Sequence, residues 1–131
     1  MMADPSYSAI LLATRIALAA VFLFSGLEKS THFQRTLQEF ERERIPLRPA
    51  SVIFTIALHL IAPICLMVGW FVTPMALALA VFTFAATILV HHFWTMEGEE
   101  RLARTRVALA NLGLICGLVL LATTGPGNLV L

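Results

Sequence analysis

The stretch AILLATRIALAAVFLFSGLEKS, residues 9–30, is long and apolar enough to cross a lipid bilayer, yet it carries an arginine, Arg15, near its middle. About 20 mostly apolar residues span the hydrocarbon core. Backbone polar groups in lipid must be satisfied within the segment, so the stretch is expected to be a helix. A permanent charge inside such a helix needs a partner, and the rest of the chain determines which partners are available.

The composition of the whole chain is that of a membrane protein. Of its 131 residues, 59% are hydrophobic and 13% are charged, whereas soluble domains carry roughly 25% charged residues. Four apolar stretches have the length of a membrane span, at about residues 8–27, 51–71, 74–93 and 107–123. We therefore expect one all-α domain over residues 1–131, a bundle of four transmembrane helices.

A short amphipathic helix is predicted between the first two spans. Phe33, Leu37 and Phe40 recur at spacings of four and three among charged and polar residues, which is a helical period. Such a helix either lies in the headgroup plane or packs on the bundle. The pattern does not distinguish the two.

The basic residues predict the orientation. All lysines and arginines except Arg15 lie in the two loops on one side of a four-span arrangement. They are Lys29, Arg35, Arg42, Arg44, Arg48, Arg101, Arg104 and Arg106. The positive-inside rule then places both loops in the cytoplasm and both termini in the periplasm of a bacterial inner membrane.

Three polar side chains inside the predicted spans form a candidate ligand site: Arg15, His59 and Asn111. A polar residue at membrane depth is a functional candidate because its burial is costly. With a helical rise of ~1.5 Å per residue, the three could meet within a turn or two of the midplane. No catalytic residue is predicted among them.

The partner of Arg15 has three possible identities, because no acidic residue lies in the second, third or fourth span. The guanidinium could reach toward the outer headgroups. It could bond the carbonyl of His59, which loses its helical N–H partner because Pro63 has none. It could also bind an oxygen of a ligand such as a quinone, a lipid phosphate or a small acid.

A second polar cluster is predicted at the cytoplasmic ends of the first and third spans. It comprises Glu28, Lys29, His91 and Trp94, and it could face a soluble partner. Histidine and tryptophan can also serve there as interfacial anchors.

Close helix contacts are favoured in the fourth span by Gly113 and Gly117. Their spacing lets helices approach closely, either within one chain or in a homo-oligomer.

The histidines do not form a pattern typical of a haem or metal site. His59 is predicted at mid-membrane, ~10 Å or more from His91 and His92 along the membrane normal, and no acid accompanies it. No basic stripe suits a nucleic acid, and no nucleophile–base pair is evident. We expect a protein with no cofactor of its own and no activity alone.

Three motifs make the chain resemble the DoxX family of small four-helix membrane proteins. The first span ends with Ser25, Gly26 and Lys29, similar to the family's SG-x-x-K after an arginine. The third ends in VHHFW, residues 90–94, and the fourth reads NLGLICGLVLLATTGPG, residues 111–127, similar to the family's N-L-x-L-x-G-G-L run and closing G-P-G.

The chain departs from the family pattern at three places. His59 stands where the family commonly has a glutamate, Ala62 and Pro63 replace a double glycine, and Ala110 replaces a lysine. The second span therefore offers no carboxylate at this position.

The resemblance implies a membrane subunit of a quinone-linked oxidoreductase, as some relatives are for thiosulfate:quinone oxidoreductase, or of an oxidative-stress complex. A soluble redox partner would then dock on the cytoplasmic side, and a quinone could touch the intramembrane site. The alternatives are a binding or transport module for a lipid or small amphiphile, and a scaffold with no ligand. Family resemblance alone does not decide among them.

Overall fold

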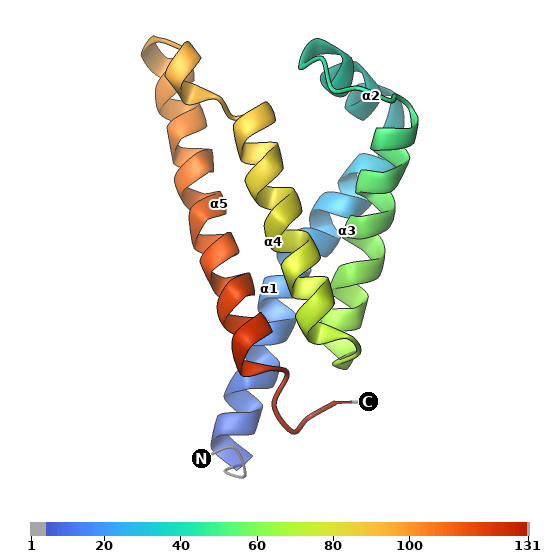
Figure 1. Ribbon diagram of the computed structural model, residues 1–131, viewed down its shortest axis with the longest axis vertical. Helices are drawn as coiled ribbons and strands as arrows, with labels where there is room; N and C mark the ends of the chain where they lie inside the picture. The colour runs from blue at the N-terminus through green and yellow to red at the C-terminus, as the bar shows by residue number, and fades with distance from the viewer. Residues whose placement is uncertain (1–4, 131) are drawn as a thin grey trace.

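The computed structural model describes residues 5–130 and consists of helices joined by short connections (Figure 1). In chain order the elements are α1 (Pro5–Thr31), α2 (Phe33–Arg42), α3 (Ala50–Val68), α4 (Val72–Leu89), the one-turn helix η1 (Phe93–Thr95) and α5 (Gly98–Thr124). Four segments, namely α1, α3, α4 with its extension to Thr95, and α5, are long and apolar enough to cross a membrane. The predicted all-α, four-span architecture is confirmed.

The long helices form two pairs that diverge. Helix α1 packs along α3, and α4 packs along α5, while the two pairs meet chiefly where α3 contacts α4. In Figure 1 the pairs lie close together at the lower end and separate toward the upper end. We call the upper end, with residues 32–49 and 90–97, the loop end, and the lower end, with residues 69–71 and 125–130, the terminal end.

The packed core is built mostly from the last turns of α3 and α5 and the first turns of α4, near the terminal end. Its buried members are Ala19, Phe22, Ala62, Leu66, Val72, Ala76, Leu79, Ala80, Leu118, Leu121 and Ala122. Alanine is the most frequent residue among them, because helices in lipid gain little from burying apolar surface and associate through close packing instead. Large side chains such as Phe24 and Val81 point outward, where lipid chains would contact them.

The helix boundaries differ from the predicted ones for local reasons. Helix α3 ends at Val68 because Gly69 adopts a left-handed φ of 88° and donates its N–H to the carbonyl of Cys65. Helix α4 ends at Leu89 instead of residue 93, and the short turn η1 follows. Helix α5 begins at Gly98 instead of residue 107, since a charged segment with two acids in its first turn is a favourable helix start outside the bilayer.

Candidate functional site

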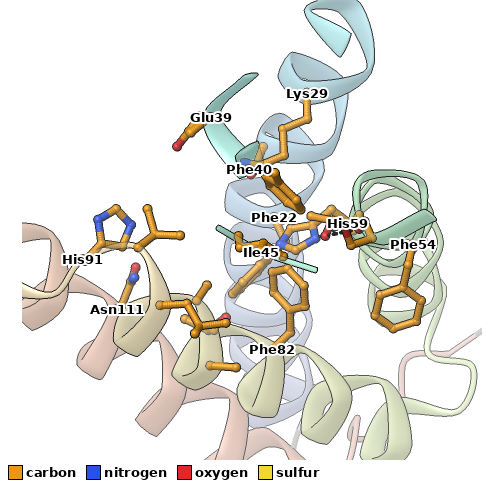
Figure 2. Close-up of a pocket in the computed structure, with 18 of the residues that line it drawn as sticks. Phe22, Lys29, Glu39, Phe40, Ile45, Phe54, His59, Phe82, His91 and Asn111 are labelled. Carbon is orange, nitrogen blue, oxygen red and sulfur yellow. Dashed lines mark hydrogen bonds between the residues drawn. The ribbon is translucent and has the colours of Figure 1, made fainter. Parts of the chain in front are cut away.

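A cavity of about 330 Å³ lies between the two helix pairs, toward the loop end (Figure 2). All four spanning helices line it, and residues of α2 and the connection after α2 complete the lining. The walls are mainly apolar. The polar side chains in the lining are Ser25, Lys29, Glu39, Ser51, Thr55, His59, Thr83, His91 and Asn111.

His59 is the deepest titratable group in this cavity, and only 5% of its surface is exposed. Its Nδ1 lies 2.8 Å from the carbonyl oxygen of Thr55. The ring sits between two phenylalanines, with centroid distances of 5.9 Å to Phe22 and 4.8 Å to Phe82. Figure 2 shows the imidazole reaching from α3 into the space between α1 and α4.

Asn111 enters the cavity from α5 on the opposite side. Its amide nitrogen donates to the hydroxyl oxygen of Thr87 over 3.0 Å. That hydroxyl donates in turn to the carbonyl of Thr83 over 2.7 Å. The amide of Asn111 is therefore anchored to α4. Asn111 and His59 line the same cavity.

Two basic side chains stand nearer the loop end of the cavity. Lys29 donates to the hydroxyl oxygen of Ser25 over 2.8 Å, and no carboxylate of residues 5–130 forms an ion pair with it. An ammonium has three donors, so Lys29 keeps donors for a ligand. The Nδ1 of His91 lies 3.2 Å from a guanidinium nitrogen of Arg104.

Helix α2 covers the loop end of the cavity, so the amphipathic helix packs on the bundle. Its buried residues are Thr36 and Phe40, and Phe40 lines the cavity. Just after α2, Glu43 is bonded to Nε2 of His92 at 2.9 Å. This bond connects the two loops, one from each helix pair, across the loop end.

The predicted polar cluster at the cytoplasmic ends is divided by the structure. Lys29 and His91 line the cavity. Glu28 is exposed and pairs with Arg35 at 3.5 Å, and Trp94 is exposed with its ring packed against Phe93.

Arg15 is separate from this cavity, which corrects the expectation that it meets His59 and Asn111. Its side chain is only 1% exposed and turns toward the terminal end, where it binds backbone oxygens. Nη1 donates to the carbonyl of Pro126 over 2.6 Å, and Nη2 donates to those of Leu129 at 2.6 Å and Met67 at 3.3 Å. The partner of the buried charge is therefore the chain's own C-terminal segment and the end of α3, rather than the carbonyl of His59.

Several lining residues were missed by sequence reasoning. Ser51 and Thr55 precede His59 at intervals of four, so one face of α3 carries all three. That periodicity could have been recognised. The contribution of Glu39 and Phe40 could not be recognised from the sequence, because it depends on how α2 packs over the bundle.

Comparisons with known proteins agree with this architecture. The DoxX family model matches residues 10–92. The chain is also 28% identical over 122 residues to inner membrane protein YphA of Escherichia coli (strain K12), covering 93% of this chain and 87% of the relative. No solved structure matches the chain significantly. Because the family match covers most of the chain and the four spans agree with it, this protein is an integral membrane protein of the DoxX family.

Proposed function

We propose that this protein is an intramembrane binding module for a small amphiphile. The observation that carries the proposal is the cavity of about 330 Å³, which has mainly apolar walls and a few polar groups. Ligand pockets typically enclose ~300–1,000 Å³ and combine these same features. The polar head would lie between Lys29 and His59, which both line the cavity.

The apolar part of the bound ligand would extend sideways out of the cavity into the lipid. Three residues of the cavity lining, Val21, Phe54 and Leu89, are each about half exposed on the outside of the bundle. Lipid chains would contact these side chains, so a ligand could enter between the helix pairs without passing through water. A charged amine such as Lys29 near the membrane surface suits an oxygen-bearing head group.

A membrane subunit of a quinone-linked oxidoreductase is the second candidate. A quinone has an apolar tail and ring carbonyls that could accept from Lys29, and the exposed Trp94, whose ring packs against Phe93, lies at the same loop end. This candidate predicts that gentle extraction retains a soluble redox protein in fixed stoichiometry. Extraction of the chain with an amphiphile and no such protein would favour the binding module.

We place the protein in the inner membrane, with the loop end in the cytoplasm. The related YphA is named as an inner membrane protein, and the basic residues of the two loops lie at the loop end. An epitope tag after the last residue should then be removed by protease added to intact spheroplasts. Protection of the tag in intact spheroplasts would contradict this orientation and indicate the opposite one.

Filling the cavity tests the binding module directly. Ala86 lines the cavity, so Ala86→Phe should place a ring where the ligand lies. Native mass spectrometry of protein extracted gently from its own membrane should show an amphiphile on the wild type. In Ala86→Phe the bound fraction should fall about tenfold or more, which corresponds to ~1.4 kcal/mol or more of binding free energy.

The matched control is Ala20→Phe, which adds the same ring to an exposed position of α1 outside the cavity lining. It should keep the adduct at the wild-type level. A wild-type chain without any adduct, or equal adducts in both variants, would contradict the binding module.

A further inference from the structure

The proton positions in the cavity are fixed by the hydrogen bonds around it. A carbonyl oxygen can only accept, so Nδ1 of His59 must carry the proton that it shares with Thr55. In the neutral ring Nε2 is then an acceptor. No group of residues 5–130 is bonded to Nε2, although the side chain is almost wholly buried.

The same reasoning fixes the amide of Asn111. The hydroxyl proton of Thr87 is donated to the carbonyl of Thr83, so the oxygen of Thr87 must accept from Asn111. The NH₂ group of Asn111 therefore faces Thr87, and its Oδ1 is left as an acceptor.

The threonines of the deep cavity offer no donors. The hydroxyls of Thr55 and Thr83 donate to the carbonyls of Ser51 and Leu79 in their own helices, over 2.8 and 2.7 Å. The deep part of the cavity therefore presents hydrogen-bond acceptors, namely Nε2 of His59 and Oδ1 of Asn111. The hydroxyls of Thr55 and Thr83 cannot donate to them, because each already donates within its own helix.

The part of the cavity nearer the loop end has the opposite character. Lys29 keeps free donors. An arginine can only donate, so Nδ1 of His91 accepts from Arg104 and the neutral ring carries its proton on Nε2. The hydroxyl of Ser51 is buried in the lining and has no hydrogen-bond partner among residues 5–130. Glu39 adds one carboxylate to this region.

We propose that the head group of the ligand carries a hydroxyl, which donates to Nε2 of His59, and an oxygen acceptor that faces Lys29. The inference rests on the proposed binding function and narrows its ligand class to alcohols and phenols, as opposed to ethers and esters. If the ligand is a quinone, the same reasoning favours the reduced form with its hydroxyl groups over the oxidised form.

A pair of probes that differ only in this hydroxyl tests the proposal. The probes are 4-octylphenol, which can donate, and 4-octylanisole, whose methyl ether can only accept. Each is titrated calorimetrically into wild-type protein in lipid nanodiscs, and empty nanodiscs correct for partition into lipid. The phenol should bind about tenfold or more tightly than the anisole, because the ether leaves a buried acceptor unpaired.

The variant His59→Phe keeps a ring and removes the acceptor, so it should lower the ratio of the two affinities toward one. His32→Phe, at an exposed histidine outside the cavity, should keep the wild-type ratio. Equal wild-type affinities for the two probes would overturn this inference and leave the binding module standing, and so would a ratio that His59→Phe does not change. If neither probe binds above empty nanodiscs, the binding module and the inference both fail. The wild-type ratio decides even if His59→Phe does not fold.

Discussion

Gly26→Ala is expected to destabilise the protein by about 1–3 kcal/mol, the usual cost of inserting a methyl group into a packed interface. An added Cβ at Gly26 would lie 2.7 Å from the carbonyl oxygen of His59 and 2.8 Å from its carbonyl carbon. These are backbone atoms of α3 and cannot rotate away. The thermal midpoint in mild detergent should therefore fall, because α1 and α3 would have to move apart.

Gly113→Ala is the matched control for this substitution. Gly113 also lies inside a spanning helix, but an added Cβ there meets no atom within 4 Å. Its thermal midpoint should stay the same or rise slightly, since alanine is the better helix former. Equal losses in both variants would show that the close approach at Gly26 does not hold the α1–α3 pair together.

Arg15→Leu is expected to release the C-terminal segment and lower stability. The substitution removes the donors for the carbonyls of Pro126, Leu129 and Met67, and a hydrogen bond to a charged group contributes ~1.5–3 kcal/mol. Residues 125–130 should then exchange their amide hydrogens faster and become sensitive to protease. The thermal midpoint should fall as well.

Two variants separate this role of Arg15 from simple changes in polarity. Arg15→Lys keeps the charge but replaces the planar fork with one ammonium, so an intermediate effect is expected. Thr14→Leu alters the neighbouring exposed position, whose hydroxyl donates to the carbonyl of Ile10 in its own helix, and should leave the segment docked. A protected segment in Arg15→Leu would refute the anchoring role.

The close packing of Gly26 on α1 against α3 connects the fold to the candidate site. The carbonyl of His59, which Pro63 leaves without a helical donor, faces Gly26 across the α1–α3 contact. Any shift of α1 against α3 would therefore move His59 relative to Phe22 on α1. Variants that disturb Gly26 should also disturb the cavity.

The four spans could be predicted from sequence because lipid imposes both their length and their helical state. The short helix α2 followed from the spacing of Phe33, Leu37 and Phe40. Its packing on the bundle did not, since that depends on the side chains it meets there. The start of α5 at Gly98 was missed because the first residues of this helix are charged and lie outside the apolar window.

The candidate site was only partly predictable, for a physical reason. Helical rise estimates depth, and it brought His59 and Asn111 to one cavity. Depth alone does not say which way a long side chain turns. Arg15 turns toward the terminal end and finds carbonyls of the segment after α5, which no count of buried acids could reveal.

The most direct test of the cavity as an amphiphile site is photolabelling with an octylphenol that carries a diazirine close to its ring. The protein is irradiated in nanodiscs, and labelled residues are identified by mass spectrometry, with and without excess 4-octylphenol. We predict adducts on the cavity residues Phe22 and Phe82 that the excess phenol suppresses. Adducts spread evenly over the lipid-facing Phe24 and Phe84, unaffected by the competitor, would contradict the account.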